Sequence, residues 1–457
     1  MKRTQTRHTM RRCYPVVAGV LALAQSCAPA EVDEGPTGRP LRERAQIRSE
    51  LNLARVEQLL LPAMRAADID CWIIMSREFN KDFVLEYIED NRENTPGGHR
   101  NAYIFFDDGS DSVRKILLGT HLPRGSRLWD EMVSYHRGEG DQGPSLAPIL
   151  REKIQELNPR RIGINESRTN PMADGLTVEM KKFLVDAIGP TYARRLVSAE
   201  PLIVEFLDTR LPEEMTYFRE AAELSKRIHW GVLDMITPGK TTLGDMRWWI
   251  YDTLADLDID TWYFHGLRVH REGSERLDAD STVVMPGDIV NNDIGVVYMG
   301  FHTDYKGTGY VLKPGETAAP EGLQQAFANA LRVQDAVFEV ARAGIPGHEI
   351  KTLSEEVCEE WGLNASVYSH STGVGGHGVG AWMNPAWPDR YGDRTLLPLR
   401  VGAVYALESH ALTPVPEWGD QVISINTEED VVLTESGYQY VVPRQEEIRI
   451  IGGAANR

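Results

Sequence analysis

Apolar residues recur at the helical and strand periods along most of the chain, and the two periods alternate in its first half. Helical spacing from Leu41 to Ala67 predicts an amphipathic helix. Short apolar runs predict strands at 70–75, 102–106, 116–118 and 161–164, and helical spacing returns at 147–157 and 178–187. Such alternation is typical of an α/β layer with a mostly parallel or mixed sheet.

The pattern changes near residue 210, and we expect one domain at 41–208 and a second at 209–457. The second half has helical spacing at 213–235, 242–257, 320–343 and 347–361, with Thr242 as a helix N-cap. Its expected strands are 262–269, 289–297, 404–407, 421–425 and 431–433, and the glycine-rich segment 369–380 is expected to be a loop.

The first thirty residues have the pattern of a secretory signal peptide. A basic segment precedes a short apolar run at 15–24, and Ala28-Pro29-Ala30 offers a small-x-small cleavage site. The run is too short to span a bilayer, which needs about 20 residues. We therefore expect no transmembrane helix and a periplasmic or extracellular protein, with 31–40 as a linker. Cys27 could alternatively carry a lipid anchor.

The formal net charge is −18, and removal of the five basic residues of the signal segment would make it −23. A surface so acidic repels phosphate backbones, which argues against a nucleic-acid partner. Of the four cysteines, Cys71 and Cys358 would certainly remain after processing. They lie in an apolar run and in a helical pattern of different domains, so we expect two separate buried thiols.

Two aspartates mark a candidate site in the second half. Asp293 lies within an apolar, β-branched run, and Asp304 follows eleven residues later, just beyond the Met299-Gly300 turn. A strand, a tight turn and a return strand would bring the two carboxylates side by side. Two like charges about 4 Å apart repel by roughly 4 kcal/mol at an effective dielectric near 20. A cation between them would turn this repulsion into attraction.

Three segments farther along the chain could complete a pocket. His377 stands between glycines in GGHGVG, Glu408 follows a short strand, and Glu428 lies in an acidic run with Glu429. Four carboxylates and one imidazole suit manganese, iron, cobalt or zinc better than a structural thiolate zinc site. Their mutual repulsion would exceed the stability of a typical domain unless divalent cations cancelled it.

These motifs resemble the pita-bread-fold metallopeptidases, which include methionine aminopeptidase, Xaa-Pro aminopeptidase, prolidase and their relative creatinase. The correspondence runs through GDIVNNDIG for Asp293, TDYKGT for Asp304, GGHGVG for His377, YALESH for Glu408 and NTEEDVVLTESG for Glu428. Glu429 competes for the last position, but the distance from Glu428 to Gly437 fits the family's spacing better. The resemblance covers about 210–450, and the first half resembles, more weakly, the N-terminal α/β domain of the aminopeptidase P, prolidase and creatinase branch.

The resemblance implies an α/β (α+β) chain in which a creatinase-like N-terminal domain precedes a pita-bread catalytic domain. It implies two divalent metal ions, manganese first, with cobalt, zinc or iron as alternatives, held by the five matched residues. It also implies a homodimer that hydrolyses short peptides as an Xaa-Pro exopeptidase, with a water or hydroxide between the ions as nucleophile. Glu408 would be both a ligand and the proton acceptor.

Departures from the family pattern leave the substrate open. Asn384 occupies the position of a family histidine seven residues after the ligand, and Gly373 occupies that of another. His370 is our first candidate to replace the missing catalytic histidine, ahead of other histidines near the ligands. Two alternatives therefore remain: the same metal site acting as a hydrolase or lyase on a non-peptide small molecule, and a binding protein that keeps the fold without catalysis.

Overall fold

The structure is a computed structural model that describes residues 38–89, 100–120, 122–123, 125–135, 145–385 and 392–452. The predicted signal peptide, Cys27 and most of the predicted linker lie outside these residues. Among the described helices, none is both long and apolar enough to cross a membrane. Cys71 and Cys358 are buried free thiols, as expected.

The chain begins with one helical stretch where the periodicity predicts it. It consists of α1 (Leu41–Arg55), a π-helical segment (Val56–Leu60) and α2 (Leu61–Ala66). The first sheet follows, with the strands in the spatial order β4 (Glu131–Ser134), β3 (Arg114–Gly119), β2 (Arg100–Phe106), β1 (Cys71–Arg77), β5 (Ile162–Ile164) and β6 (Leu196–Ser198). β1 pairs antiparallel with β2 and parallel with β5, so the sheet is mixed.

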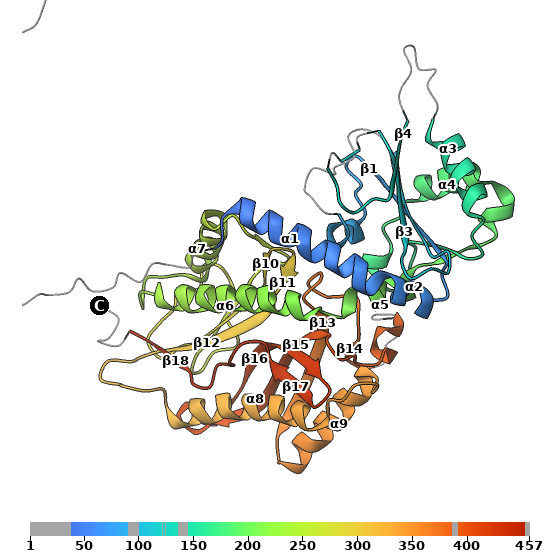
Figure 1. Cartoon of the computed structure of the whole chain (residues 1–457). Coiled ribbons are helices and arrows are strands. Elements are labelled where there is room, and N and C mark those ends of the chain that lie inside the picture. Colours follow the sequence, from blue (N-terminus) through green and yellow to red (C-terminus); the bar gives the residue numbers. More distant parts are fainter. Residues whose placement is uncertain are drawn as a thin grey trace, which may run out of the picture. The chain divides into compact units, whose positions relative to one another are not determined.

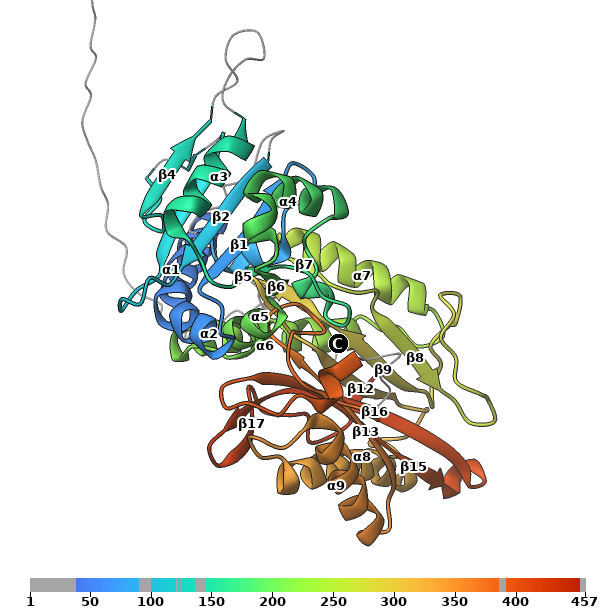
Figure 2. The ribbon, with the colours of Figure 1, turned by 90° about the vertical axis from the view of Figure 1, so that its right-hand side faces the viewer.

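Both faces of this first sheet are covered by helices, which explains the continuous apolar run of β1. Alternate residues of a strand point to opposite faces. Cys71 and Ile73 accordingly pack with α3 (Leu146–Leu157) and α4 (Val178–Ala193), whereas Trp72 and Ile74 pack with α2 and α5 (Glu200–Asp208). Figure 2 shows α3 and α4 together beside β1 and β2. Two short 3-10 helices, Phe83–Tyr87 and Pro171–Ala173, lie in the connections.

The second half is built on a larger sheet. Its strands follow the order β14 (Trp382–Met383), β13 (Asn364–Thr372), β15 (Val404–Val415), β16 (Gln421–Thr434), β12 (Tyr305–Val311), β9 (Ile289–Ile294) and β8 (Gly266–His270). β17 (Gly437–Tyr440) pairs with β16, and β18 (Arg449–Ile451) pairs with β12. A small separate sheet has the order β11 (Phe301–His302), β10 (Val296–Tyr298) and β7 (Asp260–Thr261).

Four helices pack against the larger sheet (Figure 1). α6 (Pro212–Asp234) and α7 (Leu243–Asp256) bury their apolar residues with β8, β9 and β12, while α8 (Glu321–Val340) and α9 (Gly347–Glu360) pack with β13, β15 and β16. Thr242 caps α7 as predicted, because its side chain accepts a hydrogen bond from the Asp245 amide. Short 3-10 helices at Gly392–Leu396 and Pro416–Trp418 complete the described elements.

Several strand boundaries differ from those predicted. The expected strands 421–425 and 431–433 are parts of one strand, β16, so Glu428 lies inside a strand. Glu408 likewise lies within β15 instead of ending a strand. The first residues of the expected loop 369–380 belong to β13, and the expected strand at 262–269 starts only at Gly266. Charged residues can occupy these strands because partners from distant parts of the chain compensate them.

Candidate metal centre

The register of the larger sheet places four charged residues in one row. Asp293 of β9 pairs with Lys306 of β12, Lys306 pairs with Glu428 of β16, and Glu428 pairs with Glu408 of β15. Side chains of directly opposed residues on neighbouring strands point to the same face of a sheet. Four strands separated in sequence thus bring three carboxylates and one ammonium group to one line. The hairpin predicted for Asp293 and Asp304 is present, with its turn at Met299 and Gly300.

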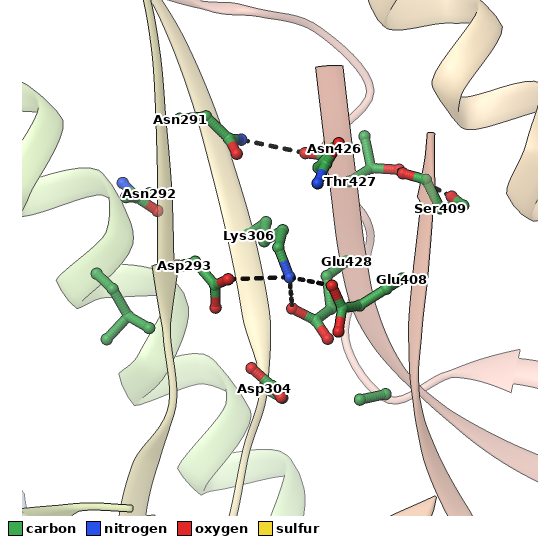
Figure 3. A network of polar contacts seen from close by, with 12 residues as sticks. Asn291, Asn292, Asp293, Asp304, Lys306, Glu408, Ser409, Asn426, Thr427 and Glu428 are labelled. Atoms are coloured by element: carbon green, nitrogen blue, oxygen red, sulfur yellow. Dashed lines mark hydrogen bonds and ion pairs between the residues drawn. The ribbon is translucent and has the colours of Figure 1, made fainter. Parts of the chain in front are cut away.

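Lys306 is the centre of this row. Its Nζ lies 3.1 Å from Asp293 Oδ2, 2.6 Å from Glu408 Oε2 and 2.5 Å from Glu428 Oε2. Figure 3 shows the ammonium group between the three carboxylates. The Lys306 side chain is only 2% exposed. Although burial alone would lower the pKa of Lys306, the surrounding carboxylates raise that pKa well above its usual value.

Asp304 and His370 approach the row from neighbouring positions on the same face. Asp304 precedes β12 by one residue, and His370 in β13 is fully buried. The His370 Nε2 atom lies 3.4 Å from Asp304 Oδ2. Asp304, His370 and Glu428 each offer a ligand atom within 4.8 Å of the other two, the one such group of buried acids and imidazoles found among the described residues. The hydroxyl of Tyr263 donates to Asp293 and, at 3.0 Å, to Asp304.

Lys306 supplies one positive charge to a centre that contains the four carboxyl groups of Asp293, Asp304, Glu408 and Glu428. Burial raises the pKa of Glu428 well above its ordinary value, and the charges of Asp304 and Glu408 raise it further. Burial also raises the pKa of Asp304, an effect that the contact with His370 opposes. Glu428 Oε1 and His370 Nε2 are buried and have no hydrogen-bond partner. Orphaned buried atoms of this kind are costly unless a ligand engages them.

These observations fit a divalent ion bound by Asp304, His370 and Glu428. Carboxylate oxygens and one imidazole nitrogen suit manganese, iron, cobalt or zinc. Lys306 lies in the middle of the row, between Asp293 and Glu408, where the resemblance implies a second ion. Sequence reasoning did not assign a role to Lys306 or to Tyr263. Lys306 had a visible signal, because it stands two residues after Asp304 and therefore shares its face of the strand.

His377 lies at the edge of the centre and outside the group formed by Asp304, His370 and Glu428. It is exposed, and its ring centroid is 4.5 Å from that of His370 and 5.2 Å from those of Trp262 and Trp382. Its role as a metal ligand stays a prediction. His370 occupies the position nearest to the carboxylates among the histidines considered in the sequence.

A cavity of about 360 Å³ adjoins His377. Trp262 and Trp382 line it together with Phe83 and Met172 from the first half of the chain. Arg394 also lines it and donates to the backbone carbonyls of His377 and Gly380, which fixes the glycine-rich turn.

Of the two acids that follow Glu428 in β16, Glu429 pairs away from the centre, whereas Asp430 contacts Asp304. Glu429 Oε2 accepts from Lys226 Nζ at 2.5 Å and is 2% exposed, on the opposite side of the strand from Glu428. Asp430 accepts from the Asp304 backbone amide at 3.2 Å, and so supports that residue from behind. Asn384 is 9% exposed, close to the end of β14.

Comparison with protein families and curated proteins places these motifs among peptidases. The model of metallopeptidase family M24 matches residues 216–435. An Xaa-Pro dipeptidase from Pyrococcus furiosus is 24% identical over 242 residues, which are 52% of this chain and 63% of that protein. An uncharacterized peptidase of Bacillus subtilis is 22% identical over 318 residues, which are 68% of this chain and 81% of its own. The chain thus matches less than two thirds of the Pyrococcus protein.

Solved structures share the fold over nearly their whole length. The X-Pro aminopeptidase of Thermotoga maritima has a TM-score of 0.63 at 16% identity and covers 85% of this chain and 99% of its own. A variant of Escherichia coli aminopeptidase P has a TM-score of 0.57 at 16% identity, with coverages of 89% and 97%. At such low identity the likeness establishes the fold: an N-terminal α/β domain followed by a pita-bread domain, as the resemblance implied.

Proposed function

We propose that this chain is a metal-dependent exopeptidase that hydrolyses short peptides, with Xaa-Pro peptides as the first candidates. The match of residues 216–435 to the model of metallopeptidase family M24 supports this proposal. The proposal rests on one observation: Asp304, His370 and Glu428 each have a potential ligand atom within 4.8 Å of those of the other two. Relatives described as Xaa-Pro dipeptidases and a structural neighbour described as an X-Pro aminopeptidase support the substrate class.

Each residue of the centre has a definite part in amide hydrolysis. Asp304, His370 and Glu428 would hold the ion, which when bound supplies a Lewis acid able to lower the pKa of water towards 7. Glu408, 24% exposed at the open end of the row, would accept the proton of the attacking water. Tyr263 holds Asp293 and Asp304 in place through its hydroxyl. We propose manganese as the first ion to test.

The cavity supports a small substrate. Its volume of about 360 Å³ lies at the lower end of the range typical of ligand pockets, which is about 300–1,000 Å³. Trp262, Trp382 and Phe83 give it aromatic walls against which a proline ring or an apolar side chain could pack. A pocket of this volume suits a dipeptide or tripeptide better than an extended chain.

Export and assembly complete the proposal. The N-terminal pattern supports export to the periplasm or the outside, with Cys27 as an alternative lipid-attachment site. The resemblance supports a homodimer. Both features can be tested on the purified protein, by mass spectrometry of the mature N-terminus and by its molecular mass in solution.

A second candidate function keeps the site and changes the substrate. Asn384 replaces a family histidine, and Lys306 stands inside the centre. Both changes alter the groups around the bond to be cleaved, which favours hydrolysis of a non-peptide small molecule over a role as a non-catalytic binding protein. The cluster of buried carboxylates would be a costly feature to keep in a protein with no use for a cation.

The proposal is tested with purified protein loaded with Mn²⁺ and assayed on a panel of Xaa-Pro dipeptides and tripeptides beside matched peptides without proline. We expect release of free amino acid from at least some of the proline peptides. Asp304→Asn should lower kcat/KM by at least about 100-fold, because it removes a ligand. Asp234→Asn, which alters an exposed aspartate paired with Arg449, is the matched control and should retain full activity. Absence of turnover on every peptide by metal-loaded protein would refute the exopeptidase assignment.

A further inference from the structure

The position of Lys306 bears on how many ions the centre binds. Its ammonium group contacts one oxygen of each of three carboxylates: Asp293, Glu408 and Glu428. These are three of the four acids that the family resemblance assigns to a pair of ions. The row therefore already contains a cation, and this cation is covalently part of the chain.

The sheet fixes this lysine in place. Lys306 lies within β12, with Asp293 opposite it on β9 and Glu428 opposite it on β16. Its backbone is therefore held on both sides by strand pairing, and its side chain shares the face of the sheet with the acids. With 2% of that side chain exposed, the ammonium group is held away from solvent among the three carboxylates.

Unused ligand atoms lie beside the row, around Glu428. Asp304, His370 and Glu428 offer atoms within 4.8 Å of one another. Glu428 Oε2 contacts Lys306, whereas Glu428 Oε1 and His370 Nε2 are buried without a hydrogen-bond partner. Glu428 can thus form an ion pair with Lys306 through Oε2 and bind a metal ion through Oε1.

We propose that Lys306 takes the place of the second metal ion, so that the centre binds one divalent ion per chain, at Asp304, His370 and Glu428. Glu428 bridges this ion and the ammonium group. A second divalent ion between Asp293 and Glu408 would have to displace the ammonium group or lie against its like charge. The proposal deepens the proposed function and concerns the same site, but the ion count is measured without substrate.

Lys306 does not reproduce all the chemistry of the ion that it replaces. An ammonium group neutralises neighbouring carboxylates and donates hydrogen bonds, but it has no empty orbital with which to polarise a carbonyl. Its contribution is to hold Asp293, Glu408 and Glu428 together around the remaining ion. Lys306 is in this sense a positioning residue, and Lewis-acid chemistry is left to the single ion.

The test is the number of Mn²⁺ ions bound by the metal-stripped full chain, measured by isothermal titration calorimetry and by elemental analysis after equilibrium dialysis. We expect one ion per wild-type chain. Lys306→Met removes the ammonium group and frees three carboxylates, so this variant should bind two. His370→Ala should weaken the wild-type ion at least tenfold. Lys226→Met removes the neighbouring buried lysine, which pairs with Glu429, and should leave the count at one.

Asp293→Asn keeps the test decisive should Lys306→Met fail to fold. Asp293 is not a ligand of the proposed single ion, so the variant should still bind one Mn²⁺, with a Kd within about threefold of wild type. Two Mn²⁺ ions bound by the wild-type chain would overturn the proposal. Loss of the single ion in Asp293→Asn would also overturn it, and so would a folded Lys306→Met that still binds only one ion. One ion without peptide turnover would refute the proposed function alone, and two ions with turnover would refute this inference alone.

Discussion

A buried ion pair between α1 and α6 provides a sharp test of the structure away from the metal centre. The Arg55 side chain is fully buried, and its Nε donates to Glu214 Oε1 at 2.8 Å while Nη2 donates to the Thr209 carbonyl at 3.0 Å. Further contacts reach the second Glu214 oxygen and the Phe206 carbonyl. Glu214 is only 5% exposed and also accepts from the Leu211 amide.

Arg55→Met keeps the apolar stem and removes the charge, which leaves Glu214 buried with a single backbone donor. Loss of one partner of a buried pair costs about 3–5 kcal/mol. The entropy of unfolding of a chain of this length is about 0.9 kcal/mol/K, so the melting temperature should fall by about 3–6 °C at pH 7. Differential scanning calorimetry measures this shift.

The destabilisation should also depend on pH. Burial would raise the pKa of Glu214, but the charges of Arg55 and Arg210, together with the hydrogen bonds that Glu214 accepts, hold that pKa below its ordinary value. A carboxyl group whose pKa is lower in the folded than in the unfolded state stabilises the fold at pH values above its unfolded pKa. This stabilisation is lost as the pH falls through the folded pKa. The difference between wild type and Arg55→Met should therefore shrink as the pH is lowered below about 4.5.

The matched control is Lys182→Met, which breaks an ion pair with Glu179 in which both side chains are about two-thirds exposed. Exposed pairs contribute about 0–1 kcal/mol, so the control should shift the melting temperature by no more than about 1 °C. If Arg55→Met lowered the melting temperature no more than Lys182→Met does, the buried pair would not exist as described.

Two further predictions concern the first half of the chain. Burial raises the pKa of Asp82 to about 6, so the folded state binds its proton more tightly than the unfolded state and stability falls as the pH rises from about 4 to 6. In urea unfolding, the free energy of unfolding of Asp82→Asn relative to wild type should rise by up to about 3 kcal/mol between pH 4 and pH 7. If this difference between variant and wild type were the same at both pH values, the burial of the Asp82 carboxyl would be contradicted. Phe83 lines the cavity, so Phe83→Ala should raise KM for a dipeptide about tenfold with kcat within about twofold; a loss confined to kcat would place Phe83 elsewhere.

Local sequence patterns were sufficient to predict elements that are determined by residues close together in the sequence. The helix at 41–67, the cap at Thr242 and the hairpin between Asp293 and Asp304 all follow from spacing, capping chemistry and turn residues within a few positions. The structure has each of them, with small changes at the ends.

Strands that carry buried charge could not be predicted in this way. β16 contains Glu428, Glu429 and Asp430, which a local pattern assigns to a loop. It is nevertheless one strand because Lys306 compensates Glu428 from 122 residues away and Lys226 compensates Glu429 from 203 residues away. No window of the sequence contains both partners.

The histidines of the centre show the same limit. The glycine-flanked His377 matches the family motif, whereas His370 is the imidazole that reaches the carboxylates in the structure. The choice depends on where β13 ends and the glycine turn begins, and strand ends are poorly specified by residue type. The spacing of two residues from Asp304 could have placed Lys306 on the same face of the strand, but its carboxylate partners on β9 and β16 follow from the strand register.

The most direct test of the central claim, that a divalent ion at Asp304, His370 and Glu428 supports peptide hydrolysis, is recovery of activity when Mn²⁺ is added stepwise to the chelated protein. We expect no cleavage of an Xaa-Pro dipeptide by the metal-free chain and full recovery at about one equivalent of Mn²⁺. Undiminished cleavage by the metal-free chain would refute metal-dependent hydrolysis at this centre.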